Sequence, residues 1–130
     1  MSEEKKHIQK DTVLDAADSD YLLLRMVPEN LIVSLLIVEG EKKGRKIYIR
    51  ESPMFIGRDE GMDIVFDDHS ISREHAVIYF YKGRFEAKDL GSTNGIFVNG
   101  KRHEKAELKN RDTLKVGKIL MRFIIESREP

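Results

Sequence analysis

The chain has 130 residues, which is enough for one domain and a tail. Its 23 Lys and Arg residues balance its 23 Asp and Glu residues, so no basic excess favours binding to nucleic acid or to a membrane surface. Because the sequence contains no cysteine, it excludes disulfides, thiolate metal sites and cysteine nucleophiles.

The first 28 residues differ from the remainder in composition. They contain no glycine and carry six acidic but only four basic residues. We expect residues 1–28 to form a flexible tail, and one interpretation of LDAADSDYLLLRM (residues 14–26) is a short helix. The N-terminus has no signal-peptide pattern, and charged residues interrupt the most apolar stretch, residues 21–38. The sequence therefore predicts no membrane segment and a cytoplasmic location.

Short strands separated by turn residues follow from Leu31 onward. The segments lie at residues 31–40, 47–50, 54–57, 63–66, 75–81, 85–90, 95–99, 112–117 and 119–126. Since no segment of ten or more residues after Leu31 has clean helical periodicity, this pattern predicts an all-β sandwich or barrel. We assign residues 29–127 to this domain and residues 128–130 to its C-terminal end, for which a linker to a further effector domain is one interpretation.

Residues suited to binding phosphate and peptide lie in the loops between these strands. Arg58 follows one strand, Ser72 and Arg73 precede another, and Thr93 and Asn94 belong to a later loop. Arginine presents a planar fork of donors that matches phosphate, and hydroxyls with backbone N–H groups can complete an anion cradle. Asparagine can both donate to and accept from a peptide backbone. The loops therefore predict a site for phosphate and peptide.

Four short motifs follow one another in this part of the chain: G-R at 57–58, S-x-x-H at 72–75, S-T-N-G at 92–95 and V-N-G at 98–100. Together they resemble the forkhead-associated (FHA) family, over about residues 31–126. The resemblance implies a β-sandwich of about eleven strands that binds phosphothreonine peptides through loops at one end. We therefore expect a non-catalytic signalling module without a cofactor.

Carried over position by position, the resemblance implies roles for ten residues. Arg58, Ser72, Arg73 and Thr93 are expected to contact the phosphate, and Asn94 is expected to bind the peptide main chain. The structural positions are Gly57, His75, Gly95, Asn99 and Gly100. Among these, His75 is expected to brace the loops without touching ligand, and Asn99-Gly100 to form a hairpin turn.

The tail contains a candidate ligand for this site. Thr12 is the only threonine in the tail, and Asp15 stands three residues after it. The FHA resemblance implies that the +3 position often decides specificity and that Asp is one of the preferences in the family. We hypothesise that a Ser/Thr kinase phosphorylates Thr12 and that the FHA pocket captures it, within one chain or between two chains as a tail-exchanged dimer. The other partner class is a phosphothreonine-containing protein.

Other kinds of site fit the sequence less well. The acidic and histidine residues of DDHSISREH (residues 67–75) have no recognised metal-ligand spacing, so we predict no metal site. A hydrolase triad would need Ser72, His75 and Asp89, but no nucleophile elbow accompanies them. Two functional alternatives stay open: an FHA scaffold that binds its partner without phosphate, and the sensory domain of a longer enzyme, such as a nucleotide cyclase, or of a transcription regulator.

Overall fold

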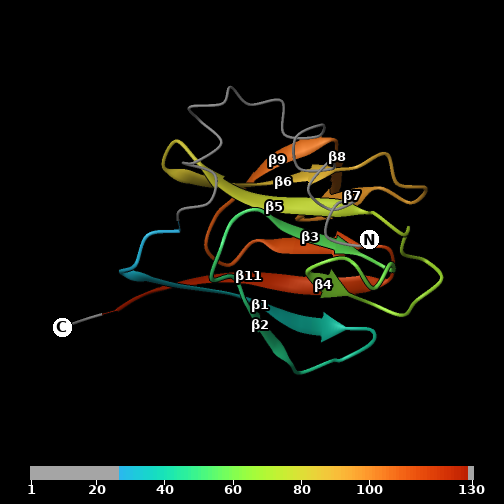
Figure 1. The fold of residues 1–130 in the computed structure, drawn as a ribbon, viewed down its shortest axis with the longest axis horizontal. Helices are drawn as coiled ribbons and strands as arrows, with labels where there is room; N and C mark the ends of the chain where they lie inside the picture. Colours follow the sequence, from blue (N-terminus) through green and yellow to red (C-terminus); the bar gives the residue numbers. More distant parts are fainter. Residues whose placement is uncertain (1–26, 129–130) are drawn as a thin grey trace.

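The fold is a sandwich of two β-sheets (Figure 1). The computed structural model describes residues 27–128, so the expected tail helix, Thr12 and Asp15 lie outside the described residues. Eleven strands form the two sheets, which confirms the all-β sandwich of about eleven strands. No helix in this part of the chain is long and apolar enough to cross a membrane.

The first sheet contains the two longest strands of the domain, which come from its two ends. Its strands, in spatial order, are β2 (Lys46–Tyr48), β1 (Leu31–Glu39), β11 (Ile119–Ser127), β10 (Thr113–Val116), β7 (Ile96–Val98) and β8 (Lys101–His103). β1 pairs antiparallel with β11, with Leu31 opposite Ser127 and Ile37 opposite Met121. The beginning and the end of the domain are thereby joined in one sheet.

The second sheet carries the strands that precede the candidate site loops. Its strands, in spatial order, are β4 (Ile64–Val65), β3 (Met54–Gly57), β5 (Ala76–Tyr81), β6 (Arg84–Asp89) and β9 (Lys105–Leu108). β3 and β4 are parallel, whereas the remaining pairs of this sheet are antiparallel. The chain crosses to the first sheet between β6 and β7, and the connecting loop contains Thr93 and Asn94.

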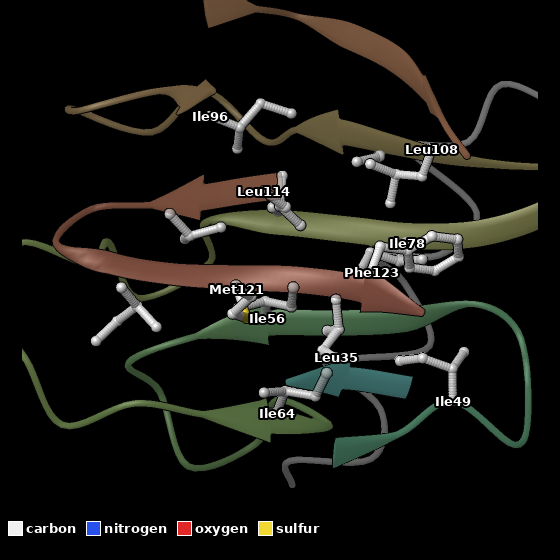
Figure 2. Close-up of a cluster of buried hydrophobic side chains, with 14 of the residues drawn as sticks. Leu35, Ile49, Ile56, Ile64, Ile78, Ile96, Leu108, Leu114, Met121 and Phe123 are labelled. Carbon is white, nitrogen blue, oxygen red and sulfur yellow. The ribbon is translucent and has the colours of Figure 1, made fainter. Parts of the chain in front are cut away.

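The core lies between the sheets and is made of branched aliphatic and aromatic side chains (Figure 2). Leu35 of β1 stands opposite Phe123 of β11, and both side chains are fully buried. Ile56 and Ile78 of the second sheet are fully buried in the same cluster. Alternate residues of each strand point to one face, so the period-two pattern of the sequence becomes one continuous apolar layer. This layer is the rigid support for the loops.

Asn99-Gly100, the later of the two Asn-Gly pairs in the sequence, forms the turn between β7 and β8. Val98 pairs with Lys101, which leaves Asn99 and Gly100 as the two loop residues, and their φ angles are 51° and 83°. Positive φ at both positions is typical of the tight hairpin turn that favours Asn-Gly. The Asn99 side chain also accepts a hydrogen bond from Thr113 N at 2.9 Å, so the turn is fastened to β10.

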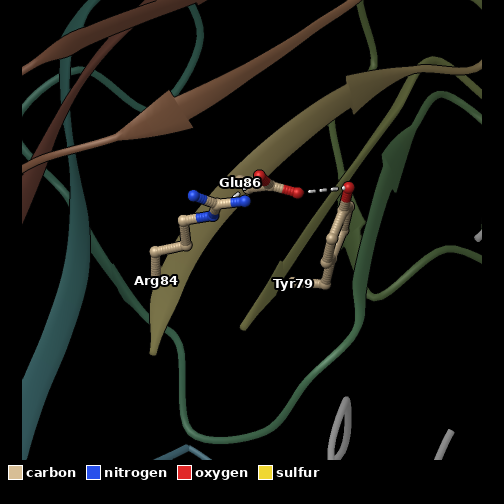
Figure 3. Close-up of polar contacts among 3 residues, drawn as sticks. All are labelled: Tyr79, Arg84 and Glu86. Atoms are coloured by element: carbon tan, nitrogen blue, oxygen red, sulfur yellow. Dashed lines mark hydrogen bonds and ion pairs between the residues drawn. The ribbon is translucent and has the colours of Figure 1, made fainter. Parts of the chain in front are cut away.

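The outer face of the second sheet carries a polar cluster (Figure 3). Tyr79 of β5 stands opposite Glu86 of β6, and its hydroxyl donates to Glu86 Oε1 at 2.8 Å. Arg84 Nε lies 3.2 Å from Glu86 Oε2 and is half exposed. Burial raises the pKa of the Tyr79 hydroxyl, and the hydrogen bond to Glu86 raises it further. The hydroxyl therefore stays protonated and acts as the donor to a buried carboxylate.

We expect the substitution Tyr79→Phe to lower the free energy of unfolding by roughly 1–3 kcal/mol, because a buried carboxylate loses its neutral donor. Urea denaturation monitored by circular dichroism measures this change. Arg84→Ala is the matched control, since an exposed ion pair contributes about 1 kcal/mol or less. Equal destabilisation by the two variants would contradict this account of Glu86.

Candidate functional site

Three loops meet at one end of the sandwich, and the β4–β5 loop lies at the right of Figure 1. They are the β3–β4 loop (residues 58–63), the β4–β5 loop (66–75) and the β6–β7 loop (90–95). Backbone hydrogen bonds join the first two, because Arg58 N donates to Ser72 O at 3.0 Å and Asp59 N donates to Arg73 O at 3.1 Å. Arg58 and Ser72 are therefore brought side by side.

Gly57 permits the close approach of these two loops. A Cβ atom at this position would lie 2.0 Å from the carbonyl oxygen of Arg73, well inside van der Waals contact. The φ angle of Gly57 is not positive, so the requirement for glycine comes from lack of space and not from backbone conformation. The G-R pair thus places Arg58 where β3 ends against the β4–β5 loop.

His75 is fully buried and joins the β4–β5 loop to the β6–β7 loop. Its Nδ1 accepts a hydrogen bond from Ser72 N at 3.1 Å, and its Nε2 lies 2.8 Å from the carbonyl oxygen of Gly95. A backbone N–H can only donate, so Nδ1 carries no proton and Nε2 is the atom that donates to Gly95. The backbone N of His75 also donates to Ile56 O, which anchors the ring to β3.

Ser72 and Arg58 each use part of their hydrogen-bonding capacity inside the protein. Ser72 Oγ accepts from Thr93 N at 3.1 Å, so the hydrogen of this hydroxyl can still be donated. Arg58 Nε donates to Ile71 O at 3.0 Å, which orients the guanidinium. Within residues 27–128, no hydrogen bond or ion pair engages the terminal N–H groups of Arg58. The hydroxyl of Ser72 and the terminal N–H groups of Arg58 are therefore left to donate to a ligand.

Asn94 and Ser70 link these loops to the turn between β10 and β11. Asn94 Nδ2 donates to Ser70 O at 2.8 Å. Ser70 Oγ donates to Asp68 Oδ1 at 2.6 Å and accepts from Lys118 N at 2.8 Å. The hydrogen bonds from the Ser70 side chain and backbone hold the pKa of Asp68 below its usual range. Because Nδ2 of Asn94 already donates to Ser70 O, the Oδ1 atom of Asn94 is the one left to accept a hydrogen bond from a peptide N–H.

The β6–β7 loop is held in shape by side chains that the sequence prediction left out of the site. Asp89 Oδ2 accepts from the backbone N of Gly91 and of Ser92, both at 3.1 Å. Ser92 Oγ donates to Asp89 Oδ1 and accepts from Gly95 N at 2.8 Å. The signal was present, because D-x-x-S is a pattern in which a carboxylate closes a turn onto its own backbone.

The predicted site residues occupy two separate places. Arg73, Thr93 and Asn94 are exposed around the buried His75, in the loop cluster. Asn99 and Gly100 form the β7–β8 turn described above and fasten it to β10. The loop cluster is therefore built from the G-R, S-x-x-H and S-T-N-G motifs, while V-N-G shapes the hairpin that follows.

This geometry gives no support to hydrolase chemistry. Both ring nitrogens of His75 are engaged by backbone groups, so the imidazole cannot take a proton from Ser72 Oγ. Asp89 binds its own loop instead of orienting the histidine. Within the described residues, no group of three His, Asp or Glu side chains could hold a metal ion.

Comparison with known proteins identifies the family. The sequence model of the FHA domain matches residues 54–117, which include the three loops and β7 to β10. The chain belongs to the FHA domain family.

Relatives of this FHA domain include named regulators. The glycogen accumulation regulator GarA of Mycolicibacterium smegmatis is 32% identical over 90 residues, which cover 69% of this chain and 57% of GarA. The oxoglutarate dehydrogenase inhibitor of Corynebacterium efficiens is 31% identical over 90 residues, which cover 69% of this chain and 63% of the inhibitor. This chain therefore spans less than two thirds of the length of either relative.

A solved structure of EmbR from Mycobacterium tuberculosis, in complex with a low-affinity phosphopeptide, has the same fold as this FHA domain. The TM-score is 0.70 at 25% sequence identity, and the match covers 97% of this chain and 31% of EmbR.

We expect His75→Ala to destabilise this FHA domain by roughly 2–5 kcal/mol, because the substitution leaves a cavity and removes the partners of Ser72 N–H and Gly95 C=O. Denaturant unfolding measures the loss. His69→Ala is the matched control, since His69 is an exposed histidine of the same loop and should change stability by about 0.5 kcal/mol or less. If both variants unfold at the same denaturant concentration, His75 does not brace the loops.

Proposed function

We propose that this FHA domain is a non-catalytic module that recognises phosphothreonine in a peptide segment of a partner protein. The observation that carries the proposal is the free capacity of two half-buried neighbours whose backbones are hydrogen-bonded: Ile71 O orients the Arg58 guanidinium and leaves its terminal N–H groups free, and Thr93 N binds Ser72 Oγ and leaves its hydroxyl hydrogen free. Donors that share one small site and lack an internal acceptor suit the oxygens of a phosphate.

Each predicted residue receives a distinct role in this proposal. Arg58 binds phosphate oxygens through its terminal N–H groups, and Ser72 donates its hydroxyl to another oxygen. Arg73 is exposed on the same loop and adds positive charge. Thr93 lines the pocket, and Asn94 accepts a main-chain N–H of the peptide through Oδ1. His75, Gly57 and Gly95 hold the loops and do not touch the ligand.

Recognition would then depend on the covalent state of the partner. An unmodified threonine offers no charged acceptor, whereas a phosphate adds nearly two negative charges and three oxygens at neutral pH. The relatives support a regulatory outcome, since one is named a glycogen accumulation regulator and another an inhibitor of oxoglutarate dehydrogenase. We propose a cytoplasmic location as well, where a protein kinase and its substrates are accessible to the domain.

We further propose that the tail of this chain is one such ligand when Thr12 is phosphorylated. Residues 13–30 separate Thr12 from β1, and a flexible chain of this length spans on average roughly 20–25 Å. Tethering supplies an effective concentration on the order of 1 mM, so a site of micromolar affinity would be almost fully occupied. Phosphorylation of Thr12 would then block partner binding within one chain or join two chains.

The central proposal is tested by fluorescence polarisation with a peptide of residues 7–18 carrying threonine, phosphothreonine or phosphoserine at position 12, together with a degenerate phosphothreonine library. Arg58→Ala should weaken phosphothreonine binding about 10- to 150-fold, which corresponds to roughly 1.5–3 kcal/mol for a charged hydrogen bond. Arg128→Ala, an exposed arginine after β11, is the matched control and should bind as the wild type does. If the domain binds peptides equally well with and without phosphate, the phosphate-independent scaffold becomes the better account.

Self-capture is tested on the whole chain phosphorylated at Thr12. The phosphorylated protein should no longer bind a labelled phosphothreonine peptide, whereas the unphosphorylated protein and a Thr12→Ala variant should bind it. Light scattering at two protein concentrations separates capture within a chain from exchange between two chains. Unchanged binding of the labelled peptide after complete phosphorylation would discard the tail as a ligand and leave the central proposal intact.

A further inference from the structure

We infer that residues 14–26 of this chain dock on the outer face of the first sheet, the face that points away from the core. There the apolar and acidic side chains of the segment would meet apolar and basic side chains of the sheet. The inference goes beyond the proposed function and does not rest on it, because it involves neither a phosphate nor the loops around Ser72.

Large apolar side chains line the outer face of the first sheet. On β1, Val33, Leu35 and Ile37 point into the core, so the residues between them point outward. The partly exposed apolar residues that point outward from this sheet are Ile32, Leu36, Tyr48, Phe97, Leu120 and Ile124. Within residues 27–128, none of these six belongs to a core cluster or packs against one. A continuous apolar surface marks a place where another segment packs.

The strand register brings these side chains together. Ser34 of β1 stands opposite Tyr48 of β2 on one side and opposite Ile124 of β11 on the other. Leu36, two residues further along β1, stands opposite Arg122. Neighbouring strands lie about 5 Å apart, so side chains at these positions touch across the sheet. The apolar side chains therefore form one patch rather than scattered points.

Positive charge borders this apolar patch. The outward-pointing basic residues are exposed, and they are Lys46, Arg102, Lys115 and Arg122. Arg122 Nη1 donates to the carbonyl oxygen of Arg111 at 2.8 Å. In the part of the chain that the structure describes, no carboxylate forms an ion pair with any of the four. The face is thus suited to a segment that carries both apolar and acidic side chains.

The 14–26 segment has this composition, and its features follow a definite order. Its apolar run YLLL (residues 21–24) lies next to the domain, and its aspartates, Asp15, Asp18 and Asp20, lie further away. Arg25 is the single basic residue of the segment, so its net charge is negative. The segment therefore offers apolar side chains first and carboxylates second, counted from the point where the tail joins the domain.

The sheet face presents matching features in the same order from the end where the tail joins β1. The apolar pair Tyr48 and Ile124 comes first. Arg122 lies two residues further from that end on β11, and Lys115 of β10 lies beyond it, opposite Leu120. A segment that folds back along the sheet would place its leucines on the apolar pair and its aspartates beside the basic residues.

The lengths agree as well. From Glu126 to Leu120, β11 extends by about 20 Å, since a strand rises roughly 3.3 Å per residue. A helix over residues 14–26, the interpretation favoured by the sequence, would also be about 20 Å long. In that conformation Asp15, Asp18 and Leu22 would lie on one side of the helix, because residues three and four apart are neighbours.

The connection to the domain favours this occupant over a second copy of the chain. Residues 27–30 alone separate the segment from β1, so the tether supplies an effective concentration on the order of 1 mM or more. A contact of low intrinsic affinity is therefore populated. Two copies joined through this face would instead bring four basic side chains against four others.

Paramagnetic relaxation in the whole, unphosphorylated chain tests the inference. Because the sequence has no cysteine, a nitroxide attached through Ser19→Cys labels one site. The backbone amide signals of Leu36, Arg122 and Ile124 should lose most of their intensity, whereas that of Lys105, on the second sheet, should keep it. High salt should restore part of the lost intensity, because the ion pairs are exposed.

Charge reversal shows whether the named basic residues hold the segment. The double variant Lys115→Glu with Arg122→Glu should abolish the signal loss, and Lys105→Glu is the matched control that should leave it unchanged.

The variant of the tail with Asp15→Lys, Asp18→Lys and Asp20→Lys should abolish the signal loss without touching the sandwich. Combined with the double variant of the sheet, it should restore that loss. Circular dichroism verifies that every variant is folded.

The remaining outcomes overturn the inference. Weak and uniform signal loss over the domain would mean that the segment does not dock, and the outer face would be left for a partner protein. Loss concentrated on the second sheet would place the segment elsewhere. Loss that passes from labelled chains to unlabelled chains in a mixed sample would assign the face to a second copy. Since no phosphate enters these measurements, each of these results leaves the proposed function standing, and failure of phosphothreonine binding leaves this inference standing.

Discussion

The buried imidazole of His75 is the interaction on which the loop end of this domain depends. One ring nitrogen accepts from Ser72 N and the other donates to Gly95 O, while the backbone N of the same residue is anchored to Ile56 of β3. Two loops and a core strand are thereby held by one side chain that has no exposed surface. Because buried polar groups are costly when unpaired, loss of this ring would release both loops at once.

The consequence is that the donors of the proposed phosphate site are positioned before any ligand arrives. Arg58 is oriented by Ile71 O through Nε, and Ser72 is oriented by Thr93 N, so in each case the internal bond uses one group and leaves another for the ligand. Ordering loops and side chains during binding costs free energy, and a prearranged site avoids most of that cost. The apolar layer between the sheets supplies the rigidity, and the loops supply the chemistry.

The two Asn-Gly pairs show how far sequence reasoning reaches. The family resemblance implied a hairpin turn at Asn99-Gly100, and in the structure Val98 pairs with Lys101 across this turn. Asn94-Gly95 has the same letters but lies in a crossing between sheets, where Asn94 binds Ser70 and Gly95 binds His75. The local pattern cannot separate the two cases, because the hydrogen-bond partners of Asn94 and Gly95 lie 24 and 20 residues away in the sequence.

The sequence by itself predicted the all-β architecture and nine of the eleven strands, because period-two hydrophobicity is a local signal, whereas the short strands β8 and β9 are rich in charged residues and carry no such signal. Tertiary structure alone decided which loops touch, that Gly57 is needed to make room for the Arg73 carbonyl, and that Arg102 of a later hairpin lies against Gly95. Contacts of this kind depend on strand order and register, which are set by the packing of the whole core. No short segment of the chain contains that information.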